Sequence, residues 1–462
     1  MPMLERRAHK YYTLSGLNNS FKSGDITASE IVEYFLANIQ KIDPKIKAFQ
    51  TIYHKSALDA GKACDLAFSS GDRIGPFHGV PFVLKDICEL KGKITTGGSA
   101  VNIRRKSKET AVVAKRLLSA GGILLGKTKT VEFAFGGWGT NQRMGTPKNP
   151  WDNKNHRVCG GSSAGSAAAL AADMAICAIG TDTGGSVRIP AAFCGLAGLK
   201  VTKDLLPTDG IIPLSHTLDT PGPMARTLMD MTIMFEVLRG VDGQKIDQDI
   251  RKNRGIFTFL TKSIKGLKVG SINDTDRKMC SSEVLHCYDK ALLALESQGA
   301  VINLYDPPIA YSEISSRMSN IIASEAYYHH GHLYDDMQSP MDEDVRARVL
   351  SAKLIDTCTY IDLLEGRKKA EKGFFDSMQK FDVLVTPTVS DEAPIVSRVD
   401  QSISPGHFTR PFNYVGMCAL SIQMGLSKIG LPLGLQVVAR PNSEALAIQV
   451  GAAVERMTRP IF

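Results

Sequence analysis

The sequence lacks a long uninterrupted hydrophobic run, an internal repeat, a low-complexity tract and an extended polar linker. Its longest apolar stretch, residues 167–179, is interrupted by Asp173. That stretch is shorter than the roughly 20 residues that a membrane-spanning helix needs. The first residues are charged and have no apolar core of the kind found in signal peptides. We therefore exclude a repeat protein and expect a soluble protein with no membrane partner.

Paired cysteines are also lacking. The chain has 9 cysteines, an odd number, and no two of them have Cys-x-x-Cys spacing. Cys177 stands in the apolar run 174–179, a setting in which cysteine usually acts as a small buried hydrophobe. This pattern is typical of a reducing compartment rather than of a disulfide framework, and it predicts a cytoplasmic location.

The sequence has little excess charge of one sign and few side chains spaced to bind a metal. The net charge is +8 over 462 residues, and the basic residues are scattered apart from short clusters at 104–108 and 251–254. This distribution favours a solvated surface over a nucleic-acid partner. His329, His330 and His332 have no acidic or histidine partner at a metal-ligand spacing. We expect a solvated helix end there, with no metal and no cofactor.

What the sequence does contain is a regular alternation of strand and helix patterns. The apolar runs at 80–84 and 123–125 indicate buried strands, and residues 112–120 between them indicate a helix. A strand–helix–strand unit follows over 267–305. Such alternation predicts an α/β fold with helices on both faces of a sheet. Because no linker interrupts the chain, one domain over residues 1–462 is the simplest organisation.

Three features carry chemistry: one lysine and two serine-bearing glycine clusters. Lys85 follows the apolar run of a predicted strand. Ser162 lies in Gly-Gly-Ser-Ser-Ala-Gly-Ser (160–166). Ser186, 24 residues further on, lies in Gly-Thr-Asp-Thr-Gly-Gly-Ser-Val-Arg (180–188). A serine is a poor nucleophile until a base removes its proton, and lysine is a suitable base once burial lowers its pKa. We expect Ser162 to carry the proton between Ser186 and Lys85, which allows amide cleavage without histidine or metal.

The glycine turn before Ser186 predicts an oxyanion hole. Gly184 and Gly185 let the backbone adopt conformations closed to other residues. Consecutive amides can then point at one spot and stabilise the charge that develops on an attacked carbonyl. Asp182 and Arg188 flank the turn, and we expect them to pair and brace it.

Two other patterns imply different functions. Residues 121–128 (Gly-Gly-Ile-Leu-Leu-Gly-Lys-Thr) match a phosphate-binding loop and would make the chain a nucleotide-binding module. Their Ile-Leu-Leu centre favours a strand instead. Residues 161–165 (Gly-Ser-Ser-Ala-Gly) match the nucleophile elbow of an α/β-hydrolase-type esterase, with Ser163 as the nucleophile. The polar segment 152–157 before them argues against the strand that an elbow requires.

At these residues the chain resembles the amidase signature family. The stretch 180–195 is very specific to that family, and the match runs from the N-terminal helix to Val438. It is densest in a signature core at about 79–223, which more variable substrate-pocket helices follow at about 226–400. The resemblance implies a single large domain with a central mixed, mostly parallel twisted β-sheet covered by helices on both faces.

The family uses a serine–serine–lysine triad. The resemblance implies that Ser186 is the nucleophile and forms an acyl-enzyme, that Ser162 is the bridging serine and follows a cis peptide, and that Lys85 is the base. It also implies oxyanion donors and supporting side chains in the same motifs. These are the amides of Thr183, Gly184, Gly185 and Ser186, and the side chains of Ser163, Asp182 and Arg188.

The resemblance leaves the substrate more open. It implies a stand-alone serine amidohydrolase that hydrolyses a small-molecule carboxylic amide, with a homodimer as one option for the quaternary state. Phe133, Ala134 and Phe135 are expected to line an apolar pocket, or else to pack in the core. The alternative is the glutaminase (A) subunit of a tRNA-dependent amidotransferase, which the chain resembles around 408–413. Those members typically carry an aspartate for the amino group of glutamine where this chain has Gly406, which argues against glutamine.

Overall fold

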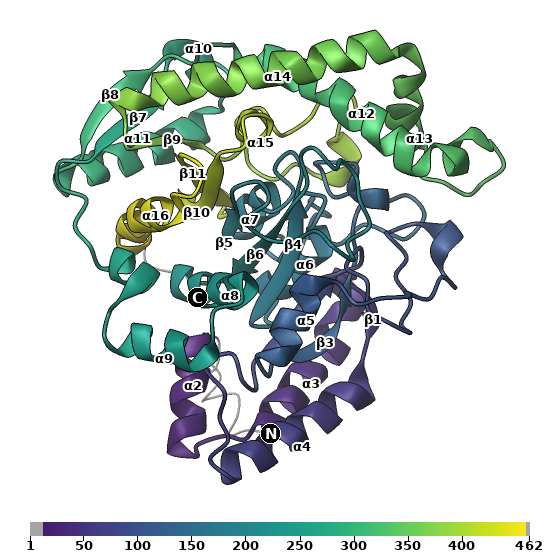
Figure 1. The fold of residues 1–462 in the computed structure, drawn as a ribbon, viewed down its shortest axis with the longest axis vertical. Helices are drawn as coiled ribbons and strands as arrows, with labels where there is room; N and C mark the ends of the chain where they lie inside the picture. The colour runs from purple at the N-terminus through teal and green to yellow at the C-terminus, as the bar shows by residue number, and fades with distance from the viewer. Residues whose placement is uncertain (1–12, 459–462) are drawn as a thin grey trace.

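One 11-stranded mixed β-sheet organises the computed structural model, which describes residues 13–458 (Figure 1). The strand order across the sheet is β1-β3-β2-β4-β6-β5-β10-β11-β9-β7-β8. The chain is therefore a single large α/β domain, as predicted. The strands are β1 (Phe49–Ile52), β2 (Pro81–Lys85), β3 (Ile123–Thr128), β4 (Cys177–Asp182), β5 (Ala197–Lys200), β6 (Thr220–Ala225), β7 (Lys268–Ile272), β8 (Val301–Tyr305), β9 (Val383–Pro387), β10 (Cys418–Leu426) and β11 (Pro432–Ala439).

Within residues 13–458, 15 α-helices surround this sheet. Figure 1 shows α12, α13 and α14 together at one end of the molecule and α2, α3 and α4 at the opposite end, with the sheet between them. The helices are α2 (Leu14–Ser23), α3 (Ala28–Ile46), α4 (His54–Ser69), α5 (Val112–Ser119), α6 (Ala164–Ala171), α7 (Arg188–Cys194), α8 (Leu228–Arg239), α9 (Gly243–Arg251), α10 (Asp274–Arg277), α11 (Ser282–Ser297), α12 (Tyr311–Asp335), α13 (Glu343–Leu350), α14 (Thr357–Ser377), α15 (Arg410–Tyr414) and α16 (Glu444–Thr458).

The prediction that parallel pairs predominate in the mixed sheet is wrong. Four neighbouring strand pairs are parallel and six are antiparallel. The cause lies in the connections. A short turn joins β10 to β11, and such a turn permits only antiparallel pairing. In addition, β6 enters between β4 and β5 and runs antiparallel to both.

The elements nearest the lysine and serine motifs follow from simple sequence features. Every residue of β2, β3 and β4 is buried, as expected for strands covered on both faces. β2 and β4 are parallel neighbours, and they end at Lys85 and Asp182 respectively. Because neighbouring parallel strands end at one edge of a sheet, this arrangement brings the lysine motif and the Ser186 motif to the same edge.

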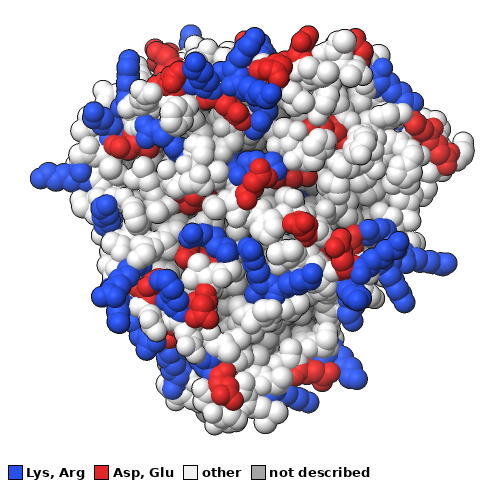
Figure 2. Space-filling model, in the orientation of Figure 1, with Lys and Arg blue, Asp and Glu red and all other residues white. Residues whose placement is uncertain are grey.

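The surface carries both signs of charge. Figure 2 shows basic and acidic side chains interspersed over one face of the molecule, a distribution typical of a solvated surface. Within the described part of the chain, no helix has both the length and the apolar character needed to cross a membrane.

Candidate active site

Lys85 is fully buried at the end of β2. Its Nζ donates hydrogen bonds to Ser162 Oγ at 2.6 Å and to Thr181 Oγ1 at 2.8 Å. Burial disfavours the ammonium form and lowers the pKa of Lys85 to about 7, although the nearby Cys88 and Asp219 act in the opposite direction. A neutral amine is therefore accessible near neutral pH, as a lysine base requires.

The backbone brings the two serine clusters together. The peptide bond between Gly161 and Ser162 is cis, as predicted. The N–H of Ser163 donates to the carbonyl of Ser186 at 3.3 Å. On the other side, the carbonyl of Ser162 accepts a hydrogen bond from the Thr130 hydroxyl at 3.0 Å. Two turns far apart in the sequence thus lie in direct contact.

Ser186 lies in the turn between β4 and α7 and borders a cavity. The preceding Gly185 has φ +122°, and a side chain there would collide with Thr409, so the turn requires glycine. Ser186 is 7% exposed. Its hydroxyl makes no hydrogen bond with any residue between 13 and 458 and is free to face the cavity. The structure therefore contains the contact between Lys85 and Ser162 but no hydrogen bond from Ser162 to Ser186.

The backbone amides of this turn are not equivalent. The N–H of Gly185 donates to Asp182 Oδ1 at 2.7 Å, so this amide is already engaged. The amides of Thr183, Gly184 and Ser186 have no acceptor within the described chain, and all three residues line the cavity. Three of the four expected oxyanion donors are therefore available to a ligand in this structure, and Gly185 is not.

Asp182 and Arg188 form the brace that the sequence suggested. Arg188 Nη2 lies 2.9 Å from Asp182 Oδ1, and both side chains are fully buried. Burial opposes ionisation of Asp182, but the adjacent guanidinium offsets this and holds the pKa of the carboxyl well below its ordinary value. Asn413 Nδ2 donates to Asp182 Oδ1 at 2.8 Å, and Gln436 Oε1 accepts from Arg188. The turn is thus held from α15 and β11 as well.

Several residues that contact this site were missed by sequence reasoning. The hydroxyl of Thr181 accepts a hydrogen bond from Lys85 Nζ. Its position beside Asp182 in the glycine cluster is the sequence feature that could have indicated this contact. Asp219 accepts a hydrogen bond from the Thr183 hydroxyl and from the backbone of Leu214 at 2.8 Å. No local pattern marks Asp219, because the contact depends on how β6 enters the sheet.

The cavity beside Ser186 has a volume of about 820 Å³, which is large enough for a small organic molecule. The predicted pocket residues Ala134 and Phe135 both line it. Phe133 lies elsewhere: its ring stacks on His330 with centroids 4.1 Å apart. The backbone explains the divergence, because Phe133 and Ala134 both have positive φ and the chain turns sharply there. Further lining residues include Thr183, Gly184, Ile189, Leu214, Ser319, Arg348, His407 and Arg410.

The histidine cluster differs from its predicted form. His332 is exposed, but His330 is buried, and its Nε2 contacts the carbonyl of Pro213 at 2.7 Å. Burial lowers the pKa of His330 to about 4, so the neutral ring donates this hydrogen bond. The expectation of a fully solvated helix end is therefore wrong for His330. Among the described residues, no group of three or more His, Cys, Asp or Glu side chains is arranged to hold a metal ion.

The two competing motifs lack the local structure that their functions need. In the first, Ile123–Thr128 is the buried strand β3, and Lys127 pairs with the buried Asp86 at 3.3 Å instead of facing an open loop. In the second, Ser163 is fully buried and its Oγ lies 3.4 Å from the carbonyl of Thr181. A bend rather than a strand precedes it. Neither segment therefore has the local geometry of a phosphate-binding loop or of a nucleophile elbow.

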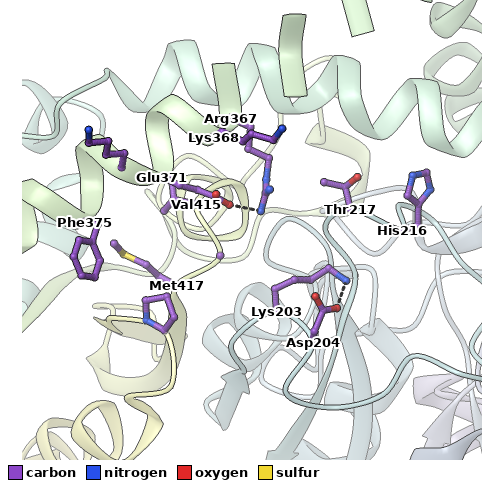
Figure 3. Close-up of a pocket in the computed structure, with 13 residues that line it drawn as sticks. Lys203, Asp204, His216, Thr217, Arg367, Lys368, Glu371, Phe375, Val415 and Met417 are labelled. Carbon is purple, nitrogen blue, oxygen red and sulfur yellow. Dashed lines mark hydrogen bonds and ion pairs between the residues drawn. The ribbon is translucent and has the colours of Figure 1, made fainter. Parts of the chain in front are cut away.

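A second cavity of about 810 Å³ lies apart from Ser186, between α14 and the loops after β5 and α15 (Figure 3). Its charged side chains are partly satisfied by one another. Lys203 pairs with Asp204 at 2.8 Å and Arg367 with Glu371 at 2.7 Å, as the dashed lines in Figure 3 indicate. None of Lys85, Ser162 and Ser186 lines this cavity.

Comparison with known proteins shows the family to which the sequence and fold belong. A family model described as Amidase matches residues 30–448. The chain is 31% identical over 478 residues to the (A) subunit of glutamyl-tRNA(Gln) amidotransferase from Alkaliphilus metalliredigens, and the match covers 96% of each chain. It is 30% identical over 441 residues to 2-amino-5-chloromuconic acid deaminase of Comamonas testosteroni, covering 94% of this chain and 93% of the relative.

A solved amidase structure is also similar to this chain in fold. The peptide amidase PAM, in complex with the competitive inhibitor chymostatin, superposes with a TM-score of 0.83 at 26% identity, covering 97% of this chain and 99% of that chain. The chain therefore belongs to the amidase family and is an enzyme that hydrolyses carbon–nitrogen bonds.

Proposed function

We propose that the protein is a serine amidohydrolase that converts a small-molecule carboxylic amide to an acid and an amine or ammonia. Ser186 is the nucleophile, Ser162 carries the proton and Lys85 is the base. The observation that carries this proposal is the fully buried Lys85, whose Nζ lies within hydrogen-bond distance of Ser162 Oγ, at 2.6 Å. A lysine in that setting has the neutral form that a base needs.

The reaction follows from these positions. Ser186 Oγ attacks the amide carbonyl and gives its proton to Ser162 as Ser162 passes its own to neutral Lys85. The available amides of Thr183, Gly184 and Ser186 stabilise the oxyanion of the tetrahedral intermediate. The proton returns from Lys85 through Ser162 to the nitrogen of the leaving group, and the carbon–nitrogen bond breaks. Water then attacks the acyl-enzyme by the same relay and releases the acid.

One movement is required. Because the Ser186 hydroxyl has no hydrogen bond to Ser162, it must rotate about its Cα–Cβ bond as the substrate binds. Catalytic hydrogen bonds are often long or poorly aligned in the free enzyme and tighten in the substrate complex. The cavity beside Ser186 leaves room for such a rotation.

Trapping the covalent intermediate tests the proposal. The purified full chain is mixed with a panel of small amides and quenched in acid within seconds, and its intact mass is measured. We expect a mass increase equal to the acyl group, located on the peptide that contains Ser186. Ser186→Ala should show no increase, while Ser163→Ala should retain it. An acyl group on Ser163 would instead support the nucleophile-elbow alternative.

One observation favours a second candidate, the glutaminase component of a tRNA-dependent amidotransferase: a relative at 31% identity carries the name of that component. Against it stands Gly406. A side chain at this position would lie 3.0 Å from Arg410 Cγ and 3.1 Å from the Gly184 carbonyl, so an aspartate would fit only if these neighbours moved by a few tenths of an ångström. Purification separates the candidates. The first requires activity from the isolated chain, and the second requires copurifying subunits and dependence on tRNA.

The remaining parts of the proposal concern the surroundings of the enzyme. All 9 cysteines are free, which supports action in the reducing cytoplasm. We propose that the enzyme works without a nucleic-acid or membrane partner. Sedimentation equilibrium on the purified chain tells a monomer from a homodimer, and the expected activity does not depend on the outcome.

A further inference from the structure

The cavity beside Ser186 contains an arginine with no counter-ion. Arg410 is the first residue of α15. Its Nη1 donates to Ser319 Oγ at 2.8 Å and to the Ser315 carbonyl at 3.3 Å. The other N–H groups of its guanidinium have no hydrogen-bond acceptor within residues 13–458, and no carboxylate of the described chain lies within 4.0 Å of the guanidinium. Because Arg410 lines the cavity, these donors are available to a ligand.

A second guanidinium adds to the positive charge. Arg348, on α13, lines the same cavity, and its Nη2 donates to Gln401 Oε1 at 2.6 Å. Asp344 partly compensates the charge of Arg348. For Arg410, burial and the charge of Arg348 both lower the pKa, to about 10, and no carboxylate opposes them. Arg410 is still a cation at neutral pH.

Neither of the two acidic residues that line the cavity, Glu343 and Asp344, pairs with Arg410. Asp344 accepts a hydrogen bond from Gln142 Nε2 at 2.9 Å and offsets part of the charge of Arg348. Glu343 lines the cavity but pairs with Arg346 at 2.9 Å and with Arg143 at 3.6 Å. His407 pairs with Asp276 at 3.0 Å. Arg410 therefore remains a half-buried cation without a carboxylate partner. A charge that is partly removed from water is costly until an opposite charge meets it.

The position of Arg410 relative to the catalytic turn limits the size of the ligand. A side-chain atom placed on Gly184 would lie 3.4 Å from Arg410 Cγ, so the stem of the arginine packs against the turn that holds Ser186. An anion bound at the guanidinium thus lies a short distance from the carbonyl under attack. The planar guanidinium donates two parallel hydrogen bonds and matches a carboxylate in shape.

We propose that Arg410 binds a carboxylate of the substrate, so that the amide hydrolysed here is the monoamide of a short dicarboxylic acid. This inference rests on the proposed function, because it names the substrate of the same site. Arg348 adds positive charge to the subsite and Ser319 holds the guanidinium in place.

Binding to a catalytically inactive protein tests the subsite without requiring turnover. In the Ser186→Ala chain, calorimetry compares succinamate and glutaramate with neutral amides of the same length, butyramide and valeramide. Charge-assisted hydrogen bonds in a buried site are strong, and we expect the anionic amides to bind at least tenfold more tightly. Adding Arg410→Met should reduce this ratio to about one. Arg254→Met, which removes an exposed arginine, is the matched control and should preserve the ratio.

Two further measurements complete the test. Circular dichroism establishes that each variant is folded. If Arg410→Met does not fold, Arg410→Lys keeps the charge but loses the paired hydrogen bonds and should weaken succinamate binding by a smaller factor. In the wild-type enzyme, succinate should compete with a small amide substrate and inhibit its hydrolysis. The inhibition constant of succinate should be at least tenfold lower than that of succinamide. This comparison needs no variant.

The outcomes separate the two proposals. Equal binding of succinamate and butyramide to the Ser186→Ala chain overturns the carboxylate subsite, and it does so even if neutral amides form an acyl-enzyme on Ser186. Preferential binding of succinamate together with no hydrolysis by the wild-type chain supports the subsite and contradicts the proposed function. A preference that survives Arg410→Met assigns the carboxylate to another group and also refutes the role of Arg410.

Discussion

The pH dependence of turnover follows from the burial of one amine. Lys85 must be neutral to accept a proton, and burial lowers its pKa to about 7. The neutral fraction is then about one half at pH 7, about one eleventh at pH 6 and about ten elevenths at pH 8. An exposed lysine would be neutral in only about one molecule in 2,500 at pH 7. We therefore expect kcat/KM to rise about tenfold between pH 6 and pH 8 and then to level off.

The assay uses a neutral amide, so that ionisation of the substrate does not contribute to the profile. Initial rates are measured from pH 5 to pH 9.5 at constant ionic strength, and circular dichroism over the same range separates loss of activity from loss of fold. Asp219 and Cys88 lie close enough to Lys85 to influence its charge. The pH profile therefore reports the pKa of Lys85 as these two neighbouring groups modify it.

Three results would refute the reasoning. If kcat/KM rises only above pH 9, Lys85 is an ordinary charged lysine and cannot be the base at neutral pH. If Lys85→Ala retains near-normal rates and the same profile, another group accepts the proton. A rate that falls from pH 5 to pH 8 contradicts the relay altogether, because the base gains its active form as the pH rises.

Three other predictions concern the relay, the brace and the core. Ser162→Ala should lower kcat by several orders of magnitude in steady-state assays. Ser163→Ala should stay folded and keep measurable residual activity. A comparable loss of kcat in both variants would contradict a special role of Ser162. Arg188→Met leaves its partner carboxylate buried and unpaired, and it should lower the free energy of unfolding in urea by about 3–5 kcal/mol. Phe35→Ala empties a fully buried position and should cost about 3–5 kcal/mol by the same measurement, while Leu354→Ala, at a position 91% exposed, should cost close to nothing.

The parts of the site that sequence could predict are those with a local cause. Lys85 follows an apolar run, and the structure shows that this run is a buried strand. The glycine turn before Ser186 and the pairing of Asp182 with Arg188 follow from residues within one short segment. Close sequence spacing was enough to suggest these contacts.

The parts that sequence could not predict depend on long-range assembly. β6 contains Pro221 and Pro223, and proline in a run of residues argues against a central strand, yet β6 lies between β4 and β5. Its placement creates the contact between Asp219 and Thr183. Arg410 belongs to a segment that the sequence distinguishes only by resemblance. Its exposure to the cavity depends on the packing of α12 against α15.

The order of strands has a consequence for how the protein is made. β10 and β11 follow all the other strands of residues 13–458 in the chain, yet they join β5 to β9 in the middle of the sheet. Until they leave the ribosome, β5 and β9 each present a bare edge, and such edges invite pairing with other chains. The nascent protein cannot complete its sheet before both strands have been synthesised. A truncation at residue 415 would leave β5 and β9 with unpaired edges and would not give a smaller stable enzyme.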